Sequence, residues 1–324
     1  MIITQTPLRI SFLGGGTDFS DFYLHTPGCV LTAAIDKYVY CIVKERFDDM
    51  IVVGYTKKEI VEKVSQLEHE LVREAMRKTG IEKGIEITFL SDIPAAGSGL
   101  GSSSSVTVGV LNALYQLQGK AVSAQVLASQ ACDIEIKILG KPIGVQDQYI
   151  AAFGGLRFID FSKKGIEVNG VRLGVVVRDK LNRNLMVFYT GTTRKAESIL
   201  EEQKQNISSK KDVLKKLAAA AREGKKLLAN GQIELFGQLL EESWKLKKLL
   251  ASGITNNQID NMYRISKKAG ALGGKISGAG GGGFLTLIVP PDKHDAVISA
   301  LAGYRHLPVN LSRDGSKVIF NINK

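Results

Sequence analysis

The sequence predicts an α+β fold of two domains. Its 324 residues suit one large or two medium domains with a sizeable core, and 44% hydrophobic and 23% charged residues are ordinary globular values. Segments typical of strands occur together with segments of helical periodicity. A short polar stretch at residues 162–165, Ser-Lys-Lys-Gly, is the predicted boundary. The predicted domains are therefore residues 1–163 and 164–324.

The predicted strands are short segments rich in β-branched and aromatic residues. They are residues 2–10, 30–44, 50–55, 85–90, 185–190, 284–289 and 317–323. Residues 149–161 combine a helix end, a glycine turn and a strand. The last of these strands, together with Val309, is expected to close a small sheet.

The predicted helices carry apolar residues at helical spacing. They are residues 57–80, 106–117, 123–139, 208–229, 233–251, 256–268 and 292–302. Gly119 ends the second of them as a C′ glycine, Ser123 caps the third, and Gly140-Lys141-Pro142 stops it. A further helix is expected to start after Gly191-Thr192-Thr193-Arg194.

The net charge of +11 is unevenly distributed along the chain. Residues 1–163 carry 16 Lys and Arg against 18 Asp and Glu, and residues 164–324 carry 27 against 14, so the two net charges are −2 and +13. A basic half predicts anionic ligands, with nucleic acid as a competing interpretation. Many of these lysines alternate with glutamates between residues 194 and 226, which is typical of a solvated helix face. With no recognised nucleic-acid motif, we expect no nucleic-acid partner.

The chain shows no targeting or membrane signal. Residues 1–12 alternate like a strand without a basic region, and no apolar run approaches the ~20 residues of a membrane helix. We therefore expect a cytoplasmic protein with no membrane partner. The three cysteines, Cys29, Cys41 and Cys132, are expected to be buried thiols, and the four histidines lack zinc-ligand spacing.

A glycine- and serine-rich stretch at residues 93–105 leads directly into an apolar helix. Glycines permit close approach of a ligand to the backbone, and serines before a helix leave an N-terminus that attracts anions. The alternative is a flexible linker, which would not lead into so apolar a helix. No Gly-Lys-Ser/Thr follows, so this is not a Walker A loop, and a metal held by Ser103 or Ser104 would add charge neutralisation. The predicted ligand is phosphate.

The same stretch resembles the nucleotide loop of the GHMP kinases, Pro-x-x-x-Gly-Leu-Gly-Ser-Ser. The resemblance implies a two-domain fold with the active site in the inter-domain cleft, and ATP and Mg²⁺ as cofactors. The residues that it assigns to the nucleotide are Pro94, Gly97, Gly99, Leu100, Gly101, Ser102, Ser103 and Ser104.

A second glycine cluster follows the first strand, and it resembles the N-terminal motif of galactokinases. Alone, Gly14-Gly15-Gly16-Thr17-Asp18 could equally be a plain glycine turn. The resemblance assigns Arg9, Gly15, Gly16, Thr17 and Asp18 to substrate binding. Gly15 and Gly16 replace a Glu and a His of that motif, which opens the sugar pocket and makes galactose a poor candidate.

Glu135 and Asp147 flank a Gly-x-Pro-x-Gly segment. In isolation Glu135 would be a surface residue paired with Lys137 or Lys141. The resemblance instead assigns Glu135, with Ser103, to Mg²⁺, and Asp147 to the acceptor hydroxyl as catalytic base. It also implies that Arg9 is catalytic and lies near Asp147, which would make that carboxylate a poorer base and a firmer anchor. Positioning of the hydroxyl could then matter more than proton removal.

A third cluster, Lys-Ile-Ser-Gly-Ala-Gly-Gly-Gly-Gly at residues 275–283, matches the C-terminal family motif. From it we assign Gly280 and Gly281 to substrate binding. All three motifs occur in family order between Arg9 and Gly283. Two longer segments, Pro-Leu-Arg-Ile-Ser-Phe and Pro-Ile-Gly-Val-Gln-Asp-Gln, resemble those of one branch of the family, the heptose 7-phosphate kinases and related sugar kinases.

This resemblance implies ATP-dependent phosphorylation of the anomeric hydroxyl of a sugar phosphate, a small-molecule partner, on the route to nucleotide-activated heptose for surface glycans. Two alternatives stay open: a kinase of another sugar, such as fucose or galactose, and a non-catalytic ATP- and sugar-binding sensor. Arg194 is a candidate for the phosphate already on the sugar, because it opens a helix in the basic half. The competing interpretation pairs Arg194 and Lys195 with Glu197 and Glu201 on a solvated face.

Overall fold

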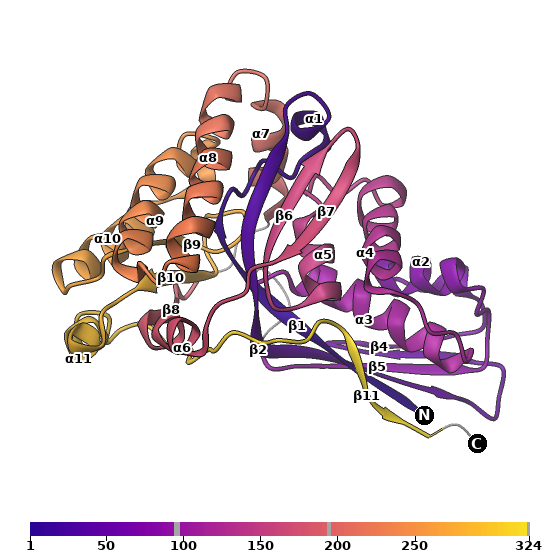
Figure 1. The fold of residues 1–324 in the computed structure, drawn as a ribbon. Helices are drawn as coiled ribbons and strands as arrows, with labels where there is room; N and C mark the ends of the chain where they lie inside the picture. The colour runs from indigo at the N-terminus through magenta and orange to yellow at the C-terminus, as the bar shows by residue number, and fades with distance from the viewer. Residues whose placement is uncertain (94–97, 193–195, 323–324) are drawn as a thin grey trace.

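Two long antiparallel strands, β1 (Ile2–Leu13) and β2 (Gly28–Glu45), run through the middle of the molecule (Figure 1). The computed structural model describes residues 1–93, 98–192 and 196–322. From Thr6 onward every residue of β1 is buried, because helices from both halves of the chain contact this strand pair. The two strands therefore connect the two lobes of the molecule.

The larger sheet is built around this pair. Its other strands are β3 (Ile51–Gly54), β4 (Lys58–Val61), β5 (Ile85–Ser91), β6 (Leu156–Ser162), β7 (Gly165–Gly170) and β11 (Lys317–Asn321). Within the described residues the order is β11-β1-β2-β5-β3-β4, with β6 beside β2 and β7 beside β6. All pairs are antiparallel except β3 with β5. The chain's last described strand thus lies next to its first, and Figure 1 shows both termini at this end of the sheet.

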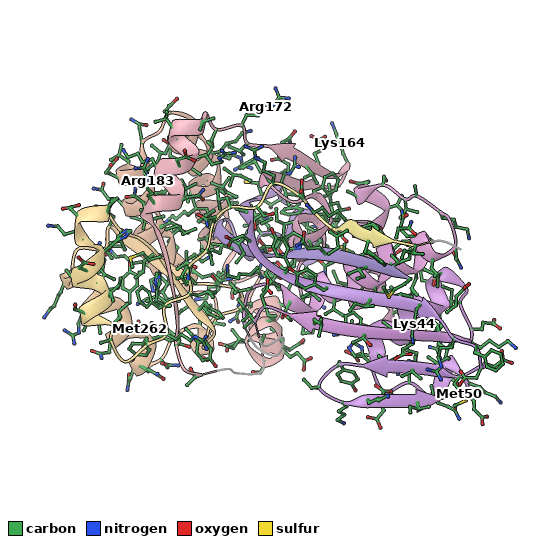
Figure 2. All side chains as sticks on the ribbon, turned by 90° about the horizontal axis from the view of Figure 1, so that it is seen from below. Lys44, Met50, Lys164, Arg172, Arg183 and Met262 are labelled. Atoms are coloured by element: carbon green, nitrogen blue, oxygen red, sulfur yellow. The ribbon has the colours of Figure 1, made fainter. Side chains whose placement is uncertain are left out.

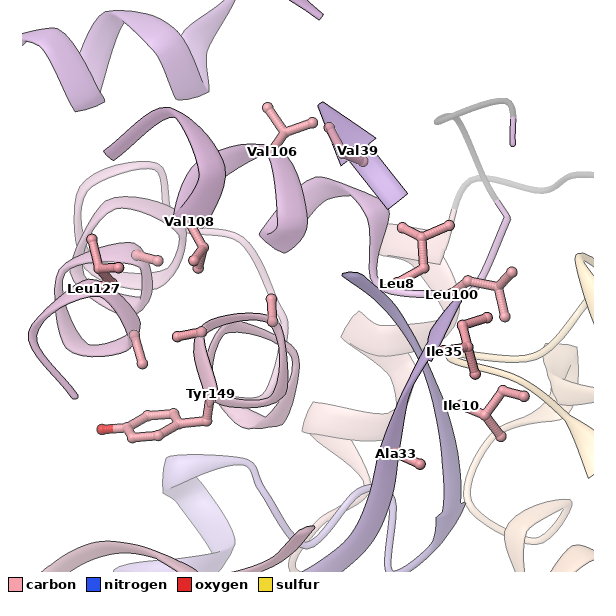
Figure 3. Packing of buried hydrophobic residues seen from close by; sticks show 14 of the residues in the cluster. Leu8, Ile10, Ala33, Ile35, Val39, Leu100, Val106, Val108, Leu127 and Tyr149 are labelled. Atoms are coloured by element: carbon pink, nitrogen blue, oxygen red, sulfur yellow. The ribbon is translucent and has the colours of Figure 1, made fainter. Parts of the chain in front are cut away.

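One layer of helices packs against this sheet. It contains η1 (Val64–Gln66), α2 (Glu70–Thr79), α3 (Ser102–Leu117), α4 (Ala124–Cys132), the π-helical turn η2 (Asp133–Ile138) and α5 (Gln146–Phe153). Helix α3 contacts α2, α4, α5 and both central strands, so every residue from Ser104 to Tyr115 is buried. Figure 3 shows Val106 and Val108 of α3 in this core, with Leu127 and Tyr149 from the neighbouring helices.

The second lobe is a smaller sheet with helices packed around it. The sheet has the order β8-β10-β9, and its strands are β8 (Leu185–Tyr189), β9 (Gly273–Ile276) and β10 (Phe284–Ile288). The other elements in this half of the chain are α6 (Val175–Asn184), α7 (Ala196–Gln205), α8 (Lys211–Ala229), α9 (Ile233–Lys247), η3 (Ser252–Ile254), α10 (Asn257–Lys268), η4 (Pro291–Lys293) and α11 (His294–Ala300). Figure 2 shows the molecule from below, with Met262 in this lobe and Lys44 and Met50 in the other.

Two element predictions are wrong. Residues 57–80 do not form one helix: Lys58–Val61 pairs with β3 as strand β4, and α2 begins only at Glu70. The apolar spacing of Val61, Val64 and Leu67 matches a helix, but pairing with a strand decides the conformation there. The C-terminal strand does not close a small sheet, because β11 pairs with β1 at the edge of the larger one. Helices α1 (Ser20–Tyr23) and α6 and strands β7 and β9 were not expected at all.

The predicted boundary at residue 163 falls in the turn between β6 and β7, and strands from both sides of it share the larger sheet. The division into residues 1–163 and 164–324 stays a prediction. Cys29 and Cys41 are buried and Cys132 is half-buried, all as free thiols. No helix in the described residues is both long and apolar enough to cross a bilayer.

Candidate active site

A cavity of about 690 Å³ lies where the two lobes meet. Its walls come from β1 and the loop after it, the start of α3, the segment before α5, helix α7, the end of α9, and the β9 region. This volume lies within the usual range for a pocket that holds small ligands. Residues from all three sequence motifs therefore line one cavity.

The N-terminus of α3 forms one wall. Gly101 is its N-cap residue, with a left-handed φ of 78°, and Ser102, Ser103 and Ser104 of the first turn line the cavity beside Gly99. Backbone N–H groups at a helix start favour an anion there. Leu100 is fully buried, and its carbonyl accepts a hydrogen bond from the Arg9 N–H at 2.9 Å. The predicted nucleotide contacts Pro94 and Gly97 lie outside the described residues.

The third motif packs directly against this loop. A Cβ at Gly99 would lie 2.5 Å from the Ser277 carbonyl oxygen, and one at Gly278 would lie 2.8 Å from the Gly99 carbonyl oxygen. The two glycine-rich segments, one from each half of the chain, thus touch through their backbones. Gly280 and Gly281 pack against Ile254 and are not among the cavity-lining residues, whereas Gly278 and Ala279 are. The substrate contacts predicted for Gly280 and Gly281 stay predictions.

Arg9 and Asp147 form a two-pronged ion pair in the cavity. Arg9 donates from Nε to Asp147 Oδ1 at 2.8 Å and from Nη2 to Oδ2 at 2.6 Å, and its Nη1 donates to the Gly99 carbonyl oxygen. Arg9 lies on β1 and Asp147 in the first turn of α5. The side chain of Arg9 is 5% exposed and that of Asp147 is 23% exposed. The arginine is therefore a fixed anchor, while the carboxylate still faces the cavity and one end of the glycine loop.

The loop after β1 brings a second carboxylate beside this pair. Asp18 is buried and accepts a hydrogen bond from the Gly16 N–H at 3.0 Å. Burial raises the pKa of Asp18, and the nearby Asp147 charge raises it further, while the Gly16 hydrogen bond and the Lys247 charge lower it. Gly144, just before α5, carries no side chain because a Cβ there would lie 2.0 Å from Asp18 Oδ2. The sequence-predicted substrate residues Gly15, Gly16 and Asp18 all line the cavity.

Thr17 belongs to the same loop but lies behind the cavity wall. It is fully buried, and its hydroxyl donates to the carbonyl oxygens of Gly14 and Cys29 at 2.8 and 2.9 Å. Ser11 donates to the Gln146 side-chain oxygen at 2.8 Å, which joins β1 to the start of α5. Neither Ser11 nor Gln146 was expected at the site, although Gln146 stands next to Asp147 in Pro-Ile-Gly-Val-Gln-Asp-Gln.

Glu135 lies at the other end of the cavity, on the π-helical turn η2, and is fully buried. Ser103 and Ser104 donate hydroxyl hydrogen bonds to its Oε2 at 3.3 and 3.2 Å. Its Oε1 has no hydrogen-bond partner among the described residues. Burial raises the pKa of Glu135 to about 7, against the opposing effect of the Lys141 charge and hydroxyl hydrogen bonds. Because Glu135 is fully buried, it is not a surface residue paired with Lys137 or Lys141.

Two buried lysines also line the cavity, and neither was expected there from the sequence. Lys247, at the end of α9, is 5% exposed, and its Nζ donates to Gln203 Oε1 at 2.7 Å and to the Gly15 carbonyl oxygen at 3.4 Å. Lys275, on β9, is 4% exposed. Lys275 is the first residue of the third glycine-rich motif. Lys247 carries no such signal, because it lies among other lysines in a helix whose sequence is typical of a solvated face. Arg194, the predicted phosphate contact, lies outside the described residues.

Comparison with known proteins assigns the class. The family model described as GHMP kinases N terminal domain matches residues 66–155, and that described as GHMP kinases C terminal matches residues 225–305. D-glycero-alpha-D-manno-heptose 7-phosphate kinase of Campylobacter jejuni is 31% identical over 318 residues, which cover 93% of each chain. The bifunctional fucokinase/GDP-fucose pyrophosphorylase of Arabidopsis thaliana is 26% identical over 324 residues, covering 90% of this chain and 30% of that protein.

The solved structures agree. The crystal structure of a D-glycero-D-manno-heptose 1-phosphate kinase from Bacteriodes thetaiotaomicron superposes with a TM-score of 0.83 at 26% identity, covering all of both chains. The fold and these relatives define the protein as an ATP-dependent phosphotransferase that acts on an alcohol group. The chain belongs to the GHMP kinase family, within which its relatives place it among the sugar kinases. The α+β fold expected for this family is confirmed.

Proposed function

We propose that the protein transfers the γ-phosphoryl group of ATP to the anomeric hydroxyl of D-glycero-D-manno-heptose 7-phosphate, on the route to nucleotide-activated heptose for surface glycans. The observation that carries the proposal is the Arg9–Asp147 pair, which faces the cavity within reach of the glycine loop. The names of two relatives support a heptose phosphate as the substrate class. These names differ in the position of the phosphate. The resemblance of the first and second motifs to those of heptose 7-phosphate kinases favours the 7-phosphate.

The reaction assigns a role to each wall of the cavity. The glycine loop and the N-terminus of α3 hold the nucleotide phosphates, and Asp147 orients the acceptor hydroxyl for in-line attack. The acceptor oxygen forms a bond to the γ-phosphorus, the bond to the ADP oxygen breaks, and the hydroxyl proton passes to Asp147. Arg9 keeps the carboxylate in place throughout, because both of its prongs are engaged.

The residues at Glu135 fit a magnesium ion. The site has a buried carboxylate with one free oxygen and two hydroxyls beside it, an all-oxygen donor set of the kind that Mg²⁺ prefers. Glu135 and Ser103 would hold the ion together with nucleotide phosphate oxygens. A bound ion would neutralise phosphate charge, which no P-loop lysine does in this loop.

The Glu135→Gln variant is expected to need about tenfold more Mg²⁺ for half-maximal activity, because the neutral amide is a weaker ligand for a hard cation. The measurement is a magnesium titration of initial rates at saturating ATP. The matched control is Asp133→Asn, on the same turn, whose carboxylate instead pairs with Lys137 at 2.7 Å. A Glu135→Gln titration that coincides with wild type would remove Glu135 from the metal site.

The acceptor is tested by ADP release over a panel of sugars and sugar phosphates. We expect the highest kcat/KM for heptose 7-phosphate, with fucose and galactose far lower, since Gly15 and Gly16 leave no side chain there to contact a sugar hydroxyl. A preference for fucose or galactose would favour the alternative kinase. ATP binding with no ADP release on any acceptor would indicate the sensor.

A further inference from the structure

Two buried ammonium groups face the cavity, and the phosphate-transfer chemistry does not use them. Lys247 and Lys275 line it and are each more than nine-tenths buried. Within the described parts of the chain, Lys275 Nζ has no hydrogen bond and no ion pair, whereas Lys247 Nζ is held by the Gln203 side chain. A buried ammonium without a partner is costly, and an anion bound beside it would offset that cost.

The two glycines that depart from the galactokinase motif lie directly in front of these groups. A Cβ at Gly15 would lie 3.9 Å from Lys275 Nζ, and a Cβ at Gly16 would lie 3.6 Å from Lys247 Nζ. Larger side chains at either position would occupy the space that the ammonium groups border. The two glycines thus leave space directly beside the Nζ atoms of Lys247 and Lys275.

The charges at this end of the cavity do not balance. Arg9 is neutralised by Asp147, which leaves Asp18 as the carboxylate whose charge acts on both lysines. Burial, together with the Lys247 and Arg9 charges, lowers the pKa of Lys275 to about 7, and the Asp18 charge opposes the shift. Burial also lowers the pKa of Lys247 to about 8, with Asp18 opposing the shift. One carboxylate facing two ammonium groups gives this end of the cavity a net positive charge when both lysines are protonated.

We propose that Lys275 and Lys247 form the subsite that binds the phosphate already present on the acceptor. The inference rests on the proposed function and names the residues that select a phosphorylated sugar. The site lies beside Gly15 and Gly16 and next to the Ser11–Gln146 contact, at the loop after β1 that the proposed function assigns to the acceptor. Nucleotide phosphates are already served by the N-terminus of α3. The basic half of the chain therefore contributes two specific charges to the cleft.

The test compares wild type, Lys275→Met and Lys247→Met on heptose 7-phosphate and on heptose without phosphate. Losing one charge-assisted contact should lower kcat/KM for the phosphorylated acceptor roughly 10- to 100-fold. The value for the unphosphorylated sugar and the KM for ATP should change less than about threefold, since the remaining contacts are the same. Lys267→Met is the matched control, because that partly buried lysine pairs with Glu241 away from the cavity. Equal losses on both acceptors would overturn the proposal.

A pH profile adds a readout that a merely structural lysine would not change. The charged groups facing Lys275 are Arg9 from β1, Asp18 from the loop after it, and Lys247 from α9. Lysine loses its charge as pH rises through its pKa, while a phosphate monoester is already a dianion above pH ~7. The preference for the phosphorylated acceptor should fall between about pH 7 and pH 9 in wild type and stay flatter in Lys275→Met. A wild-type preference independent of pH would contradict the subsite.

The two proposals fail in different ways. If wild type releases no ADP with heptose 7-phosphate, the proposed function fails. If wild type turns over the 7-phosphate while Lys275→Met and Lys247→Met bind it as wild type does, measured calorimetrically without ATP, only the subsite fails. Thermal melts of both variants identify any loss of folding, and calorimetry on whichever variant folds then decides the question.

Discussion

Replacing Asp147 by asparagine is expected to lower kcat by at least about a hundredfold, the usual scale for an acid–base group. The carboxylate accepts both hydrogen bonds from Arg9 and faces the cavity. Asparagine has one acceptor oxygen, so it cannot keep both arginine contacts or take a proton. Steady-state rates at saturating ATP and acceptor measure the effect.

The control for this variant is Asp160→Asn, since that carboxylate lies on β6 and contacts Asn169 outside the cavity. ATP affinity and the thermal midpoint should be close to wild type in both variants. An Asp147→Asn enzyme with kcat within a few-fold of wild type would show that Asp147 neither positions nor deprotonates the acceptor.

The Gly99→Ala variant is expected to raise the KM for ATP by at least about tenfold, the cost of losing one or more phosphate contacts of 1–2 kcal/mol each. Gly99 has a φ of 70°, and a Cβ there would lie 2.5 Å from the Ser277 carbonyl oxygen. Backbone atoms cannot move aside as a flexible side chain can, so the glycine loop and the third motif must separate. Initial rates against ATP concentration measure the change.

Gly119→Ala is a closely matched control. Gly119 has nearly the same φ, 71°, but nothing lies within 4 Å of the added Cβ. Both variants carry the strain of alanine at positive φ, roughly 1 kcal/mol. Only Gly99→Ala adds the clash with Ser277. Equal KM values for ATP in the two variants would show that contact between the glycine segments does not shape the nucleotide site.

The sequence predicted the parts of the site that are written in short local motifs. The glycine–serine loop, the strand with Arg9 and the turn with Asp147 each carry their own signal, and the structure brings all three to one cavity. The pairing of Arg9 with Asp147 was expected from the resemblance. The π-helical turn under Glu135 was not, because the preceding residues have ordinary helical periodicity and nothing in their order marks a change of pitch.

The lysine pair could not be predicted from the sequence. Lys247 and Lys275 are separated in the chain, and their burial depends on the approach of α9 and β9 to the loop after β1. The local composition around Lys247 would predict an exposed side chain, since a lysine among other charged residues is usually solvated. The helix prediction for residues 58–61 was wrong for a similar reason. Their apolar spacing fits a helix, but they pair with β3 as a strand.

The central claim is that this cleft phosphorylates the anomeric hydroxyl of a sugar that already carries a phosphate. Phosphorus NMR of the product made from ATP and heptose 7-phosphate tests it most directly. The account predicts a second monoester signal coupled to the anomeric proton, with the original 7-phosphate signal unchanged. A product phosphorylated at another hydroxyl, or no product while an unphosphorylated sugar is converted, would contradict it.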